Sequence, residues 1–84
     1  MTAWSREALA QRIVEILRED ILDVDERFTA TSSLVDAGLD SLAVTQLLLA
    51  LEESTGIWVD ESLLTPENLA SAEALAACVV DLAS

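Results

Sequence analysis

The sequence predicts an all-α fold: a small bundle of three main helices and one short helix, with a long connection between the first two main helices. Hydrophobic residues make up 52% of the chain, enough to bury one core. Only two glycines and one proline interrupt the 84 residues, and aromatic residues are 4%, which favours helices over a β-sandwich or barrel. Three segments also repeat apolar residues at helical spacing. A chain of this length is expected to form a single domain over residues 1–84.

The first helix is expected to begin after Ser5 and to run to about Asp20. A serine at the N-cap accepts a hydrogen bond from a free amide of the first turn. Apolar and charged residues fall on opposite sides, as in an amphipathic bundle helix. The inward residues are Leu9, Ile13, Ile16 and Leu17, and the outward ones are Arg12, Glu15, Arg18 and Glu19.

Residues 21–40 lose the helical spacing and are expected to form the long connection. Connections longer than about 12 to 15 residues are uncommon in compact domains and are often functional. Its apolar residues, which are expected to anchor it to the core, are Leu22, Val24, Phe28, Leu34 and Leu39.

The second main helix is expected to start at Asp40 or Ser41 and to end near Gly56. Glycine suits the left-handed turn that follows a helix. The expected core stripe of this helix is Val44, Leu47, Leu48 and Leu51.

The segment TPENLAS is expected to hold the short helix, because Thr65 suits an N-cap and Pro66 the first helical position. Ser71 is expected to cap the last helix. Trp4 and Trp58 lie outside the regular stripes and are expected to close the ends of the bundle. The expected inward residues of the last helix are Ala72, Leu75, Ala76, Val79 and Leu82.

The net charge of −12 comes from 16 acidic and four basic residues and disfavours nucleic acid and membrane surfaces as partners. All basic residues precede Phe28, so partners of the rest of the chain are expected to be basic. No run of about 20 apolar residues and no signal peptide is present, so the expected location is the cytoplasm.

Hydrolytic chemistry is excluded within this chain. It has no histidine and no lysine, so neither a Ser-His-Asp nor a Ser-Lys arrangement can form. Ala43 also stands where a nucleophile elbow needs its second glycine. Glu52 and Glu53 are adjacent on a solvated helix end, which is typical of solubility charges rather than of an acid/base pair.

No metal site and no second reactive residue are expected. Asp23 and Asp25 begin a segment that looks like a calcium loop. Phe28, however, stands where that loop needs glycine, and Leu34 where it needs a bidentate glutamate. Cys78, the one cysteine, is expected to be an inert, buried residue near the inner face of the last helix.

The segment Gly38-Leu39-Asp40-Ser41-Leu42 stands at the start of the second helix. Together with the length, acidity, long connection and helix order of the chain, this motif resembles the attachment motif of acyl and peptidyl carrier proteins. The resemblance covers nearly the whole chain, including LEESTG at the end of the second helix and PENLASAEAL before the last. It implies that the protein is not an enzyme, and that a phosphopantetheinyl transferase moves 4′-phosphopantetheine from coenzyme A onto Ser41.

Physical reasoning assigns the motif residues compatible roles. A phosphodiester on Ser41 would lie at a helix N-terminus, where free amides and the dipole favour an anion. Gly38 allows a tight turn and leaves room for the transferase, while Leu42 completes the motif. Asp40 can cap the helix, and by the resemblance it helps hold the transferase's magnesium ion. The alternative is an ordinary helix start, with Asp40 as the cap and no cofactor.

A second face of the same helix carries Leu42, Thr45 and Leu49, which core packing does not require. We expect a small apolar docking patch for partner enzymes, with Glu52 and Glu53 at its rim for electrostatic steering. The alternative is that single exposed leucines have no function. A small patch implies weak, brief binding by a monomeric shuttle.

The sequence departs from the bacterial fatty-acid carriers that it otherwise resembles. Ala43 and Gln46 replace acidic residues, Thr55 replaces an aromatic residue, and Val59-Asp60 replaces Ile-Pro. It looks more like freestanding carriers of specialised polyketide, nonribosomal peptide or antibiotic biosynthesis, which hold acyl or aminoacyl thioesters. Such a carrier would meet a loading enzyme and a downstream synthase, ligase or transferase. The alternatives are a fatty-acid carrier, an unmodified carrier-like protein, and an acidic helical adaptor without cofactor.

Overall fold

The computed structural model describes residues 4–22 and 24–83, and all their side chains except those of residues 61, 82 and 83. Asp23 and the side chain of Leu82 therefore lie outside the described residues. The helices are α1 (Arg6–Ile16), the π-helical turn η1 (Leu17–Ile21), α2 (Ser41–Thr55), the 3₁₀ turn η2 (Glu61–Leu63) and α3 (Ala72–Ala83). Within the described residues there is no strand, and the all-α prediction is confirmed.

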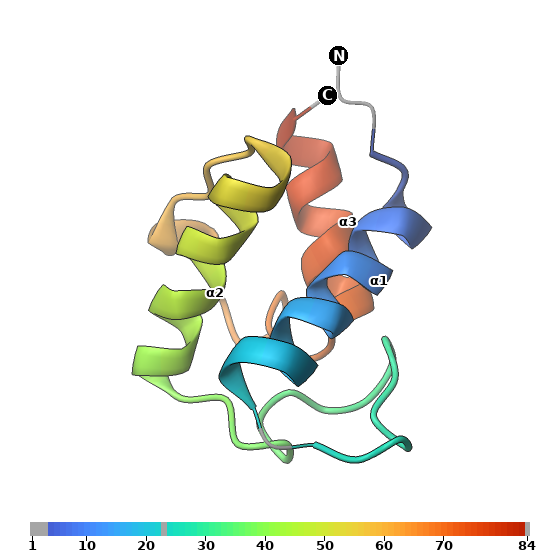
Figure 1. Cartoon of the computed structure of the whole chain (residues 1–84). Coiled ribbons are helices and arrows are strands. Elements are labelled where there is room, and N and C mark those ends of the chain that lie inside the picture. Colours follow the sequence, from blue (N-terminus) through green and yellow to red (C-terminus); the bar gives the residue numbers. More distant parts are fainter. Residues whose placement is uncertain (1–3, 23, 84) are drawn as a thin grey trace.

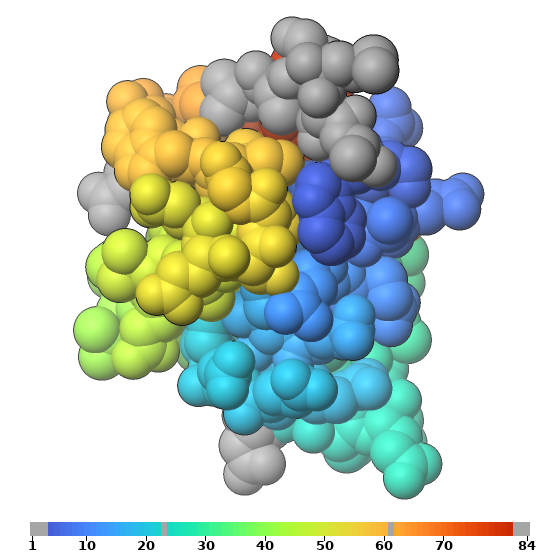
Figure 2. Space-filling view, turned by 45° about the horizontal axis from the view of Figure 1, so that its top comes forward, coloured from blue at the N-terminus to red at the C-terminus, as the bar shows by residue number. Residues whose placement is uncertain are grey.

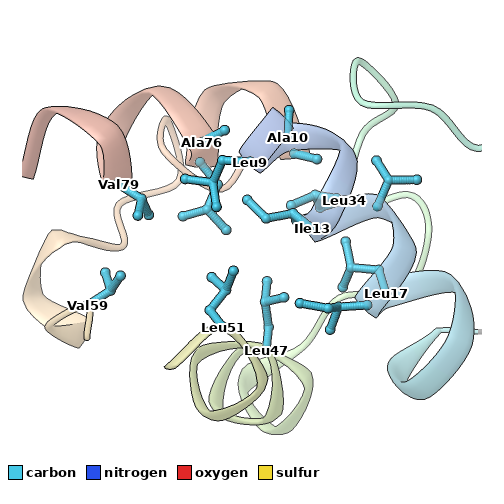
Figure 3. Packing of buried hydrophobic residues seen from close by; sticks show 14 of the residues in the cluster. Leu9, Ala10, Ile13, Leu17, Leu34, Leu47, Leu51, Val59, Ala76 and Val79 are labelled. Atoms are coloured by element: carbon cyan, nitrogen blue, oxygen red, sulfur yellow. The ribbon is translucent and has the colours of Figure 1, made fainter. Parts of the chain in front are cut away.

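The three α-helices surround one core. In Figure 1, α1 and α3 lie side by side, and α2 lies opposite this pair of helices. Figure 3 shows Leu47 and Leu51 of α2 pointing towards the apolar residues of α1. The fully buried large side chains are Leu9, Ile13, Leu17, Leu34, Leu47, Leu51, Leu75 and Val79.

Helix α1 begins as its sequence predicts. The hydroxyl of Ser5 accepts a hydrogen bond from the Ala8 amide at 3.1 Å. The helix then widens into η1, where the Leu22 N–H donates to the Leu17 carbonyl five residues back at 2.7 Å. The expected end near Asp20 is confirmed, because Asp20 lies in this widened turn.

The ends of α2 and the start of α3 follow from capping residues. Asp40 is the N-cap of α2, and Gly56, at a φ of 75°, is its left-handed C-cap. Ser71 accepts a hydrogen bond from the Ala74 amide at 3.1 Å, as expected before α3. Each of these boundaries coincides with a capping residue that the sequence predicts.

The long connection is fastened to the core and to the chain that precedes α3. Phe28 is 6% exposed and Leu34 is fully buried, so both act as the expected anchors. Two backbone hydrogen bonds then join the connection to the start of the last helix. The Leu34 amide donates to the Ala70 carbonyl at 3.2 Å, and the Glu73 amide donates to the Ala30 carbonyl at 2.9 Å. These bonds fix the path of the chain towards α2.

The expectation that Trp58 closes an end of the bundle is wrong, since this side chain is 65% exposed. Residues 57–60 form no helix or turn, and successive side chains of an extended segment point in opposite directions. Ile57 and Val59 pack on the core, so Trp58 between them faces outward. Trp4 does pack against the core.

The segment after Thr65 is a turn over residues 66–69, and the short helical element is η2, a few residues earlier. The Thr65 hydroxyl does accept from the Asn68 amide at 3.2 Å, as a cap would. The Asn68 side chain donates back to the Leu63 carbonyl at 2.6 Å. This return bond holds the turn against η2 and favours a compact loop over a longer helix.

Two core expectations on the helices are corrected. The buried stripe of α2 is Ala43, Leu47 and Leu51, whereas Val44 and Leu48 are only half-buried on its flank. Cys78 is half-buried rather than fully buried, because it stands beside the inward stripe of α3 and not on it. Periodicity gave the direction of each stripe, but its width depends on how closely the neighbouring segments pack.

In the described part of the chain, every helix is too short or too polar to cross a membrane.

Candidate functional site

The turn before α2 depends on Gly38. Its amide donates to the Val35 carbonyl at 3.1 Å, and the next amide, of Leu39, donates to the Leu34 carbonyl at 2.9 Å. Gly38 has a φ of 105°, which residues with a side chain rarely adopt. A Cβ there would meet only the Leu22 side chain, at 4.0 Å, so backbone conformation and not space requires glycine.

Asp40 caps α2 as the sequence predicts. Its Oδ1 accepts a hydrogen bond from the Ala43 amide at 2.8 Å, and its carbonyl accepts from the Val44 amide at 2.9 Å. The amides of Ser41 and Leu42 precede the first intrahelical bond, so no helical carbonyl is available to them. They add to the positive end of the helix dipole.

Ser41 is the first residue of α2, and its side chain is exposed. Its carbonyl accepts a hydrogen bond from the Thr45 hydroxyl at 3.2 Å, one turn further along the helix. An exposed hydroxyl beside free amides at a helix N-terminus fits an ester-linked phosphate, which would remain in solvent and gain from the dipole. This geometry fits a phosphopantetheine group on Ser41.

An open groove of about 520 Å³ adjoins Ser41. It runs between the start of α2, the turn before it and the segment that follows η2. Half-buried Val44, which is not part of the central core stripe, lies in this groove. We call this hollow the Ser41 groove. Its lining residues are Val35, Leu39, Asp40, Ser41, Val44, Thr45, Leu64, Pro66 and Leu69.

The docking face expected on α2 is exposed. Leu42 is 67% and Leu49 60% exposed, and Thr45, Glu52 and Glu53 are also exposed. At about 100° per residue, these five positions fall on one side of the helix. The structure thus brings the five residues together, while their role in docking stays a prediction.

Two exposed apolar residues were not recognised as site candidates. Val35 is 69% exposed beside the Ser41 groove, and Trp58 lines a second groove of about 310 Å³ beside the other half of α2. Both lie in irregular segments, where no periodicity separates inward from outward residues. The residues next to Trp58 gave no signal either, because Ile57, Trp58 and Val59 are three apolar residues in a row.

The surface around these grooves is acidic. The chain has no basic residue after Arg27. Figure 2 shows α2 and the segment that follows it as one continuous surface beside α1. Among residues 4–22 and 24–83, no three or more histidine, cysteine or acidic side chains are grouped to hold a metal ion. The role of Asp40 towards the transferase's magnesium stays a prediction.

Comparison with known proteins agrees with the geometry of this site. A family model described as "Phosphopantetheine attachment site" matches residues 7–79. Two solved carrier-protein chains are 32% identical to this chain, each match covering 88% of this chain and 97% of the other. No curated protein sequence is significantly similar to it.

Both similar chains come from ligase complexes. One belongs to the crystal structure of Bradyrhizobium japonicum glycine:[carrier protein] ligase complexed with glycylated carrier protein, with a TM-score of 0.64. The other belongs to an engineered form of that ligase complexed with carrier protein from Agrobacterium tumefaciens and ATP, with a TM-score of 0.69.

Proposed function

The chain belongs to the phosphopantetheine-attachment family of acyl and peptidyl carrier proteins, which are carriers rather than enzymes, and we propose that it carries aminoacyl groups from a loading ligase to later enzymes. Members of this family bear a covalently attached 4′-phosphopantetheine arm, whose terminal thiol holds the cargo as a thioester. The proposed attachment residue is Ser41.

The observation that carries this proposal is the exposed position of Ser41 as the first residue of α2, inside the matched range. Gly38 supplies the left-handed turn, and Asp40 caps the helix through Ala43. The side chain of Ser41 is thereby held outside the core, where a transferase can reach it. Leu42 supports the motif as an exposed apolar contact.

The aminoacyl cargo is supported by the two similar chains, because both occur with a ligase named for glycine, and one of them is glycylated. Within this proposal, a phosphopantetheinyl transferase and an aminoacyl-loading ligase bind the α2 face, followed by a downstream synthase, ligase or transferase of specialised peptide or polyketide biosynthesis. We further propose that residues 1–84 form one monomeric carrier domain that acts in the cytoplasm.

Intact-protein mass spectrometry tests the attachment. After incubation with coenzyme A, magnesium and a broad-specificity phosphopantetheinyl transferase, the wild type should gain the mass of one arm. Ser41→Ala should gain none, while the matched control Ser62→Ala, which removes another exposed serine, should gain one. An unmodified wild type, or a modified Ser41→Ala, would refute the proposal.

The cargo needs a second measurement. The arm-bearing protein is incubated with the Bradyrhizobium japonicum ligase, ATP and glycine or other amino acids. The phosphopantetheine arm is then ejected in the mass spectrometer, and the mass added to it is measured. An aminoacyl mass supports the proposal. If the chain isolated from its host bears only a fatty acyl group, the aminoacyl proposal is wrong although the attachment stands.

A further inference from the structure

The second groove beside α2 has an aromatic wall. Trp58 is 65% exposed and lines this groove together with Leu49, which is 60% exposed. Half-buried Leu48 and buried Val59 also line it. Large apolar side chains left in solvent next to a hollow are typical of protein contact sites. We call this feature the Trp58 groove, with its lining Thr45, Leu48, Leu49, Glu52, Trp58, Val59 and Asp60.

Two carboxylates border the same groove. Glu52 comes from α2 and Asp60 from the segment after it. Asp60 Oδ1 accepts a hydrogen bond from the Ser62 amide at 2.9 Å, which fixes the carboxylate and leaves its other oxygen for a partner. The last turn of α2 contains no basic residue, so the negative end of the helix dipole adds to the potential here.

Within residues 4–22 and 24–83, no basic side chain lines this groove. All four arginines lie at or before position 27. Arg12 donates to the Ser54 hydroxyl, and Arg18 donates to the Phe28 carbonyl. None of the residues that line the Trp58 groove is basic. An aromatic face with two carboxylates and no internal cation is complementary to a cation brought by another protein.

We propose that the Trp58 groove receives an arginine side chain from the surface of the loading enzyme. This inference rests on the proposed carrier function. A guanidinium group is planar, so it stacks on the indole of Trp58 while its N–H groups donate to Glu52 and Asp60. An ammonium group is a compact charge and cannot combine both contacts as well. An apolar side chain would displace water from the two carboxylates and could not replace the hydrogen bonds that this water makes.

The position of the groove gives this contact a function in orientation. Thr45 lines both the Trp58 groove and the Ser41 groove, and its hydroxyl donates to the Ser41 carbonyl. An arginine bound at Trp58 therefore fixes the partner along α2 at a defined distance from Ser41. The exposed docking residues determine which face of α2 the partner contacts. The arginine determines the position of the partner along the helix.

NMR of the unmodified protein tests the inference with N-acetyl-arginine amide as the probe. The protein has two indole N–H signals, from Trp58 and Trp4, and Trp4 packs against the core and serves as an internal reference. The Trp58 signal should shift saturably with the arginine probe and only weakly with N-acetyl-citrulline amide, its neutral analogue. Salt should reduce the shift.

Variants identify the groups responsible. Glu52→Gln and Asp60→Asn should each weaken binding of the arginine probe by roughly two- to fivefold, as expected for an exposed ion pair. The matched control is Glu73→Gln, which removes an exposed carboxylate of α3 that does not line the groove and should leave binding unchanged. Trp58→Ala should abolish the arginine-dependent shifts of neighbouring backbone amides.

Other outcomes overturn the inference. Equal shifts with the citrulline probe, or with N-acetyl-lysine amide, would remove the basis for arginine. A stronger response to N-acetyl-norleucine amide would indicate an apolar occupant, and a Trp58 signal that moves with protein concentration alone would indicate a second copy of the chain. Because the protein is unmodified, failure of attachment at Ser41 does not change this result, and the two proposals fail separately.

Discussion

Arg12 of α1 and Ser54 of α2 join the two helices directly: the Nε of Arg12 donates a hydrogen bond to the Ser54 Oγ at 2.6 Å across 42 residues of sequence. The bond is partly buried and lies in the last turns of α2, far along the helix from Ser41. It holds the C-terminal end of α2 against α1, where few other polar contacts between these helices exist among the described residues.

Ser54→Ala should therefore lower the free energy of unfolding by about 1–2 kcal/mol, because a partly buried charged donor loses its acceptor. Urea denaturation followed by circular dichroism measures this change. Ser62→Ala removes an exposed hydroxyl and should stay within about 0.5 kcal/mol of the wild type. Equal effects of the two substitutions would show that the bond adds nothing to stability.

Asp40→Ala should cost about 1 kcal/mol of stability, because it removes the side chain that caps α2. Asp40→Asn keeps an acceptor for the Ala43 amide and should restore most of that stability. If the carboxylate also serves the transferase's magnesium, Asp40→Asn should still slow modification. Modification at the wild-type rate in a stable Asp40→Asn protein would limit Asp40 to capping.

Leu47 and Leu42 lie on the same helix with opposite exposures, 0% and 67%. Leu47→Ala should destabilise the fold by about 2–5 kcal/mol, since it leaves a cavity in the core. Leu42→Ala should change stability by less than about 0.5 kcal/mol. Urea denaturation of both variants checks that Leu47 is a core residue and Leu42 a surface residue. A large loss of stability in Leu42→Ala would contradict this.

Leu49→Glu should leave the helix content unchanged and slow loading by the partner ligase roughly tenfold, equivalent to about 1.4 kcal/mol of lost contact. Gln11→Glu is the matched control, because it adds the same charge at an exposed position on α1. The rate of aminoacyl loading is measured under conditions in which it is proportional to the concentration of the carrier. Equal rates for Leu49→Glu and wild type would exclude Leu49 from the docking surface.

The helix ends of this protein follow from local chemistry, which is why the sequence predicted them. Ser5, Asp40, Gly56 and Ser71 act on their own turns, whatever lies around them. Ser41 was predicted as the attachment residue for another reason, the resemblance of its motif and of the whole chain to acyl and peptidyl carrier proteins, and the helix start observed there is compatible with that prediction.

The features that sequence reasoning missed depend on contacts between distant segments. Val44 and Leu48 sit at the flank of the core because the chain on that side leaves two grooves open. Trp58 faces solvent because Val59 takes the inward position. Asn68 turns the segment after Thr65 back towards Leu63. No local pattern reports such neighbours.

The two backbone hydrogen bonds between the long connection and the chain around α3 make the geometry of Ser41 depend on residues far behind it in the sequence. Leu34 and Ala30 pair with Ala70 and Glu73, so a polypeptide truncated after Leu69 lacks both partners of the connection. A transferase that recognises the folded turn should therefore modify this truncated polypeptide much more slowly than the intact chain. Modification of the purified truncated polypeptide at the rate of the intact chain would show that the motif alone is sufficient.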